Sequence, residues 1–152
     1  MKLSNQWPGF SFWQQWLFYS SLLFAAAGLA FAIFGNSFIF NQYNAMLDKI
    51  FWPGMVIPSQ AAKFRAFIYG PLGGTIACCY ILLAFIARYP FNEKKRWARN
   101  AIIIAFGVWV ITDSAVCIYF KVFPQVYIIN TISIIVKALP IIFTWKFFYG
   151  GE

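Results

Sequence analysis

The sequence has no histidine, and only four of its 152 residues are acidic, Asp48, Glu93, Asp113 and Glu152. Without imidazole the chain cannot provide a His-ligated haem, a zinc site with imidazole ligands, or a Ser-His or Cys-His nucleophile pair. No two of the acidic residues have the spacing of a paired-carboxylate helix motif, so a di-metal or glycosidase-type centre lacks its ligands. We therefore predict no metal and no redox cofactor.

Cysteines, nucleotide-binding motifs and charges are also scarce. The three cysteines, Cys78, Cys79 and Cys117, form no CxxC motif and lie inside apolar stretches, which is typical of small buried side chains. The sequence contains neither a Walker loop nor a dinucleotide-binding glycine fingerprint. Charged residues make up 11% of the chain, whereas an average soluble domain has about 25%. This composition excludes an ordinary soluble domain.

Apolar side chains are what the chain has in excess. They make up 62% of its residues, and 22% of the residues are aromatic. A chain of this length has too few polar residues to cover a core in water, so the excess must face lipid. The lysines and arginines that give the chain its formal net charge of +8 lie between the apolar runs rather than on a soluble face. A membrane surface, and not nucleic acid, is therefore the expected partner of the basic residues.

Four apolar runs are long enough to cross a hydrocarbon core of about 30 Å, which needs about 20 helical residues. They cover approximately residues 16–34, 66–87, 101–120 and 126–145. Such unbroken runs lack the alternation of barrel strands, so the spanning form must be helical. We predict a single all-α domain over residues 1–152, a four-helix transmembrane bundle of an integral, multi-pass membrane protein.

An amphipathic segment lies between the first two runs. Its apolar residues recur at helical spacing and its polar residues lie on the other side: the apolar set is Tyr43, Met46, Leu47, Ile50 and Phe51, and the polar set is Asn44 and Asp48. The sequence Trp52-Pro53-Gly54 then stops the helix. We predict a short helix that lies on the outer membrane surface or caps the bundle.

The distribution of basic residues predicts the orientation. The loop from Arg88 to Asn100 contains five basic residues and one acidic residue, and loops rich in lysine and arginine remain in the cytoplasm. Placing this loop inside also places both termini inside. We therefore predict cytoplasmic N- and C-termini. The same loop could hold anionic lipid headgroups, although setting the topology is the simpler role.

Small residues offer places where helices can approach closely. Gly28 belongs to a stripe of small residues in the first span, and Gly70 and Gly74 form a GxxxG pattern in the second. Helices associate in lipid through such close packing. We predict that Gly28, Gly70 and Gly74 pack helices within the bundle, with homo-oligomerisation as the alternative.

Two ionisable residues lie inside predicted spans, Asp113 in the third and Lys137 in the fourth. Ionisable residues in spans are rare and mark functional sites. Both side chains tilt toward the N-terminus of their own helix, and the two helices are antiparallel, so Asp113 and Lys137 approach each other. We predict that they form an ion pair within a polar cluster.

This cluster is the predicted ligand-binding site, and its members lie on facing sides of the last two spans: Trp109, Asp113, Cys117, Asn130, Ser133 and Lys137. Three roles remain open. The ion pair could only fix the helix register; the cluster could bind a ligand whose polar or cationic head meets Asp113; or it could relay protons or ions. The last role is the weakest, because a lone carboxylate makes a poor relay.

Three stretches resemble the EXPERA superfamily, the group of sterol isomerases, emopamil-binding proteins and sigma-two receptors. They are Phe64-Arg65-Ala66-Phe67, Lys95-Arg96-Trp97-Ala98-Arg99-Asn100 and Lys137-Ala138-Leu139-Pro140-Ile141-Ile142. The resemblance implies a four-helix fold with a pocket for sterol-like molecules or lipophilic amines. Pro71 falls about where the family has an acidic residue in its second span, so the resemblance implies no catalytic residue here.

Taken together, these observations predict a membrane protein that binds a hydrophobic small molecule (sterol-like, a lipid or a lipophilic amine) in a cavity between its helices. Membrane lipids are its expected partners. The alternative is a structural or accessory subunit that docks on a larger membrane complex through its small-residue stripes. An isomerase-like activity is implied only by the resemblance.

Overall fold

Helices form nearly all of the molecule. The computed structural model describes residues 9–149, and within them no strand is present. The elements in chain order are α1 (Phe10–Phe34), η1 (Phe38–Phe40), α2 (Asn41–Phe51), α3 (Ser59–Arg88), α4 (Arg96–Tyr119), the π-helical η2 (Gln125–Asn130), α5 (Thr131–Thr144) and η3 (Trp145–Phe148). The predicted all-α class is confirmed. Residues 1–8 and 150–152 of the predicted domain, with Glu152, lie outside the described residues.

Four helical segments are long and apolar enough to cross a membrane. They are α1, α3, α4 and the continuous stretch Gln125–Phe148, with 25, 30, 24 and 24 residues. At about 1.5 Å per residue, even the shortest exceeds the hydrocarbon thickness. Each contains one predicted span, apart from a single residue at the end of α4. This result is consistent with an integral membrane protein.

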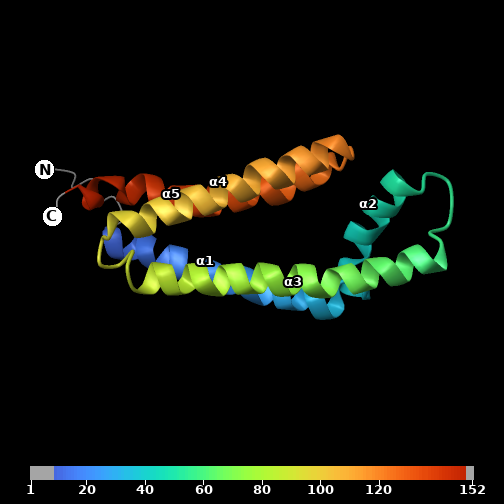
Figure 1. The fold of residues 1–152 in the computed structure, drawn as a ribbon, viewed down its shortest axis with the longest axis horizontal. Helices are drawn as coiled ribbons and strands as arrows, with labels where there is room; N and C mark the ends of the chain where they lie inside the picture. Colours follow the sequence, from blue (N-terminus) through green and yellow to red (C-terminus); the bar gives the residue numbers. More distant parts are fainter. Residues whose placement is uncertain (1–8, 150–152) are drawn as a thin grey trace, which may run out of the picture.

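The helices form two antiparallel pairs (Figure 1). In one pair α1 lies along α3; in the other, α4 runs beside the stretch that leads through η2 into α5. The pairs meet mainly where α5 contacts α1. The start of α1 and the stretch that follows α5 lie at one end, which we call the terminal end, and α2 lies at the other, the α2 end (Figure 1). The predicted amphipathic helix between the first two spans is thus confirmed.

The main apolar core lies toward the terminal end. It contains residues from every long helix and from η3: Leu17, Ala87, Phe91, Ala98, Ile102, Ile141 and Phe148. The α4 helix takes part only through its first two turns, and no residue of α4 beyond Ile102 is buried. The two pairs are therefore joined at the terminal end, while most of α4 has an open surface.

Close approach of α1 and α3 depends on Gly28 and Gly73. A Cβ added to Gly73 would lie 2.5 Å from the carbonyl oxygen of Gly28, and a Cβ on Gly28 would lie 2.8 Å from the backbone nitrogen of Ala77. In contrast, a Cβ on Gly70 or Gly74 would meet nothing within 4 Å. The expectation that Gly70 and Gly74 pack helices is corrected here, because α3 is rotated so that Gly73 faces α1.

The same rotation corrects the predicted burial of two cysteines. Cys78 and Cys79 are exposed, and Cys117 is half-buried. The inner face of α3 is formed instead by Gly73, Ala77 and their helical neighbours. Cys78 and Cys79 fall on the outer faces of this helix, where a small side chain with little polarity meets acyl chains at low cost.

Candidate functional site

A stripe of polar side chains runs along one face of α5 and the preceding turn η2. Asn130, Ser133, Lys137 and Thr144 are all buried. Their spacings of three, four and seven residues place them on one side of a helix with 3.6 residues per turn. Because the rest of this segment is apolar and largely exposed, the stripe is the face that α5 turns toward the protein interior.

Lys137 is the charged member of this stripe, and its side chain is 1% exposed. Its Nζ donates hydrogen bonds to the hydroxyl oxygens of Ser20, at 3.0 Å, and Ser21, at 3.3 Å, on α1. The same nitrogen lies 4.9 Å from the ring centroid of Phe24 and 5.0 Å from that of Tyr80. Hydroxyl acceptors and aromatic faces together therefore stabilise the buried ammonium group.

The predicted ion pair between Asp113 and Lys137 is wrong. Neither residue has an oppositely charged partner among residues 9–149. Asp113 contacts Asn130, which precedes Lys137 by seven residues, or about 10 Å along the helix axis. Lys137 instead turns toward α1 and α3. The two charges are thus at different positions along the helix axis, and their side chains point in different directions around it.

Asp113 belongs to a second polar cluster near the α2 end. The Nδ2 of Asn130 donates hydrogen bonds to the Oδ2 of Asp113, at 2.8 Å, and to the Oγ of Ser114, at 3.0 Å. The Cys117 thiol lies 3.7 Å from the same carboxylate oxygen. The Oδ1 of Asn130 is buried without a hydrogen-bond partner. The cluster therefore combines a carboxylate with an unsatisfied amide acceptor.

The last residue of η2 is Asn130. Single π-helical turns are rare and occur frequently at functional sites. Tyr43 of α2 is half-buried: burial raises the pKa of Tyr43 to about 12, and the charges of Tyr69, Cys117 and Asp113 add to this increase. The π-helical turn η2 thus ends at Asn130, the residue that contacts the Asp113 carboxylate of α4.

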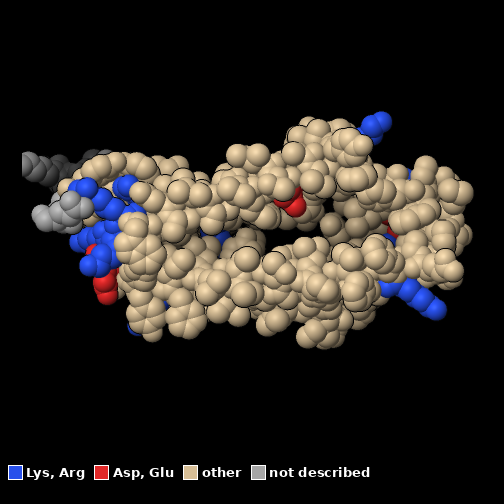
Figure 2. All heavy atoms as spheres, viewed as in Figure 1, with Lys and Arg blue, Asp and Glu red and all other residues tan. Residues whose placement is uncertain are grey.

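An apolar cavity of about 300 Å³ lies between α4 and α5. It is lined by Ile102, Ile103, Phe106, Gly107, Val110, Ile134, Lys137, Ala138, Ile141 and Ile142. Two of these residues connect it to the Asp113 cluster, since Val110 lies one helical turn from Asp113 and Ile134 one turn from Asn130. The space-filling view shows a further hollow between the two helical pairs, with acidic atoms at its edge on the α4/α5 side (Figure 2).

Five of the six predicted site residues therefore fall into two groups. Asp113, Cys117 and Asn130 come together, and Lys137 and Ser133 form the second group, one helical turn apart on the buried face of α5. Trp109 belongs to neither group, because its ring packs against Phe106, 5.1 Å away between centroids. Trp109 is not among the residues that line the cavity.

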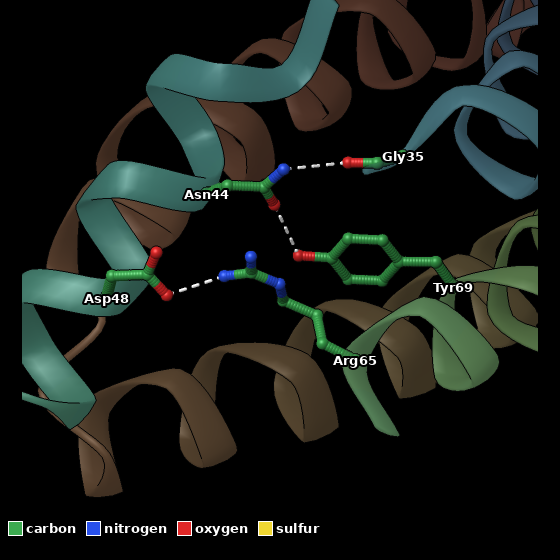
Figure 3. Close-up of polar contacts among 5 residues, drawn as sticks. All are labelled: Gly35, Asn44, Asp48, Arg65 and Tyr69. Atoms are coloured by element: carbon green, nitrogen blue, oxygen red, sulfur yellow. Dashed lines mark hydrogen bonds and ion pairs between the residues drawn. The ribbon is translucent and has the colours of Figure 1, made fainter. Parts of the chain in front are cut away.

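A polar network that the sequence did not reveal joins α2 to the first helical pair (Figure 3). Asn44 donates from Nδ2 to the carbonyl oxygen of Gly35, at 2.8 Å, and accepts at Oδ1 from the Tyr69 hydroxyl, at 2.8 Å. Asp48 forms an ion pair with Arg65. The polar side of the amphipathic helix therefore faces the protein. The matching spacing of four residues in both pairs, Asn44/Asp48 and Arg65/Tyr69, is the signal that could have found it.

Comparison of the chain with protein-family models, with curated proteins and with solved structures finds no match. The resemblance to the EXPERA superfamily therefore stays a prediction. Within the described part of the chain, no three cysteine, aspartate or glutamate side chains come close enough to hold a metal ion.

Proposed function

We propose that this protein binds an amphiphilic small molecule, with the apolar body in the cavity between α4 and α5 and an amine-bearing head at Asp113 and Asn130. The proposal is supported by two hydrogen-bond acceptors that lie side by side. The Asp113 carboxylate has no basic partner among the described residues, and the buried Oδ1 of Asn130 accepts no hydrogen bond. Both are complementary to a group that carries positive charge and N–H donors.

Energetics support a cationic head in preference to a neutral one. A carboxylate at mid-helix in lipid costs about 2.5–3.5 kcal/mol on insertion scales unless it is paired or solvated. In the protein it accepts one hydrogen bond from the Asn130 amide and a weak one from the Cys117 thiol. An ammonium group would add charge-assisted hydrogen bonds to Asp113 and occupy the free Oδ1 of Asn130.

The cavity supports an apolar body next to this head. Its volume of about 300 Å³ is at the lower end of the range for small-molecule sites. Its walls are aliphatic except for Phe106 and the buried Lys137. A lipid, a sterol-like molecule or a lipophilic amine would fit this combination, and a lipophilic amine would fit it best. The resemblance to the EXPERA superfamily, whose members bind such ligands among their helices, points the same way.

The test is binding of a lipophilic amine to the purified full chain and to the Asp113→Asn variant. Loss of a charge-assisted hydrogen bond of about 1.5–3 kcal/mol weakens binding at least tenfold. Glu93→Gln is the matched control, because it removes the same charge from an exposed position and leaves the affinity unchanged. A second variant, Val110→Trp, fills the cavity without altering charge and also weakens binding. Equal affinity of all four proteins contradicts the proposal.

A second candidate function is that of an accessory subunit of a larger membrane complex. The observation that favours it is the open surface of α4 beyond Ile102, together with the open glycines Gly70 and Gly74 on α3. Small residues on an exposed face allow another helix to approach closely. Purification in a mild detergent tests this role, and recovery of the lone chain only would contradict it.

A further inference from the structure

Basic side chains gather at the terminal end of the molecule (Figure 2). They come from the end of α3, from the loop and first turn of α4, and from η3: Arg88, Lys94, Lys95, Arg96, Arg99 and Lys146. Among the described residues of this region, Glu93 is the acidic one, and it lies 3.9 Å from Lys95. The local charge is therefore strongly positive, which attracts anions.

Arg99 forms the centre of this cluster. Its side chain is buried, with 6% exposed, and its guanidinium carbon lies 4.1 Å from the ring centroid of Trp145. The rings of Phe148 and Tyr149 are each 5.4 Å away. Nε and Nη2 donate to the Oδ1 of Asn100, at 3.2 and 3.0 Å, whereas Nη1 is buried without a partner.

A buried arginine with an unpartnered N–H group is suited to bind an anion. Buried polar groups are almost always hydrogen-bonded, and an orphaned donor indicates an ion or water that completes the site. The aromatic rings fix the guanidinium plane, and a planar guanidinium binds phosphate oxygens in a defined geometry. Asn100 is neutral, and among residues 9–149 no carboxylate pairs with Arg99 to compensate its positive charge.

Two lysines extend the cluster across the rings of Phe10 and Phe147. The Nζ of Lys94 lies 5.4 Å from the Phe10 centroid and 5.9 Å from that of Phe147, and the Nζ of Lys146 lies 5.3 Å from the latter. Both ammonium groups are thus held beside an apolar surface. Trp97, 59% exposed, adds an indole of the kind that prefers the membrane interface.

We propose that Arg99, Lys94 and Lys146 form a binding site for the phosphate of an anionic lipid headgroup. A soluble phosphate offers the same oxygens, but the apolar rings beside the cations and the exposed Trp97 favour a molecule that also has acyl chains. This site lies at the opposite end of the spans from α2, far from Asp113, and does not depend on the proposed function.

Thermal unfolding of the full chain in a neutral detergent tests the site. Titration with short-chain phosphatidylglycerol raises the melting temperature in a saturable way, whereas phosphatidylcholine and inorganic phosphate do not. Lys94→Gln and Lys146→Gln each weaken the apparent affinity about fivefold, as expected for one basic residue near a membrane surface. Arg99→Gln weakens it further, unless this variant fails to fold, in which case the lysine variants decide.

Lys63→Gln is the matched control, since it removes the same charge from an exposed position at the α2 end and leaves the affinity unchanged. Equal stabilisation by phosphatidylglycerol and phosphatidylcholine overturns the proposal. Equal stabilisation by inorganic phosphate overturns the lipid assignment and indicates a soluble anion. Equal weakening by Lys63→Gln shows that only overall charge matters, and also overturns the site.

Discussion

A charge inside a membrane span needs hydrogen-bonding partners, and here the buried Lys137 and the half-buried Asp113 both find them among neutral side chains. Lys137 binds two serine hydroxyls and two aromatic faces, while Asp113 binds an amide and a thiol. Neutral partners do not neutralise the negative charge of Asp113 as a basic side chain would. That is why Asp113 can interact with a ligand cation without first losing an internal ion pair.

The independence of these two charges can be measured in a double-mutant cycle. We expect the destabilisations by Asp113→Asn and Lys137→Met to add within about 0.5 kcal/mol, because the residues share no contact. Unfolding in detergent mixtures gives the free energies. If the double variant is markedly more stable than the sum predicts, the two residues are coupled as an ion pair, and the assignment of Asp113 to a ligand is then unsupported.

The glycine contact between α1 and α3 gives a second prediction at this scale. Gly73→Leu forces the helices apart and destabilises the protein by at least about 1–3 kcal/mol, the usual cost of overpacking. Gly74→Leu, one residue away, meets open space and leaves the melting temperature nearly unchanged. The reverse order of the two effects would show that the GxxxG glycines form the contact after all.

At the scale of the elements, the four spans could be predicted because lipid demands about 20 apolar residues in helix. Their ends could not, since polar residues such as Gln14 and Arg99 continue the helices past the apolar runs. The polar stripe on α5 follows from helical periodicity alone. The predicted ion pair between Asp113 and Lys137 was wrong because periodicity gives neither the rotation of one helix against another nor the relative position of two residues along the helix axes.

The docking of α2 was also not predicted, for a related reason. Its contacts join residues 17 and 25 positions apart, Asp48 with Arg65 and Asn44 with Tyr69. Hydrophobic periodicity shows which residues share a face, and it does not show whether the polar face meets water or protein. In this chain the polar face meets the protein, because Arg65 and Tyr69 provide partners for it.

The half-buried Tyr43 makes this docking sensitive to high pH. Its pKa is raised to about 12 from the ordinary 10, so the folded protein favours the neutral hydroxyl. The resulting stability is complete below pH 10 and is lost as the pH rises toward 12, by up to about 1.4 kcal/mol for each pH unit. We expect the free energy of unfolding to fall less steeply over this interval in Tyr43→Phe. An identical fall in both proteins would contradict the docking of Tyr43.

At the scale of the whole molecule, the basic terminal end predicts the orientation of the protein. Loops rich in lysine and arginine remain cytoplasmic, and the terminal end contains six such residues from Arg88 to Lys146. In a background without native cysteines, a membrane-impermeant thiol reagent should label Met55→Cys in intact cells. Glu93→Cys should be labelled only after the membrane is opened. The opposite pattern would reverse the topology.

The central claim is that the α4–α5 cavity and the Asp113 cluster together hold one amphiphile. Photo-crosslinking of the full chain with a lipophilic amine that carries a diazirine on its apolar body tests it most directly. We predict saturable labelling of the cavity walls, within residues 102–110 and 134–142, which excess unlabelled amine abolishes and Asp113→Asn reduces. Labelling that spreads over the exposed faces of α1 and α3, and that competitor does not displace, would contradict the account.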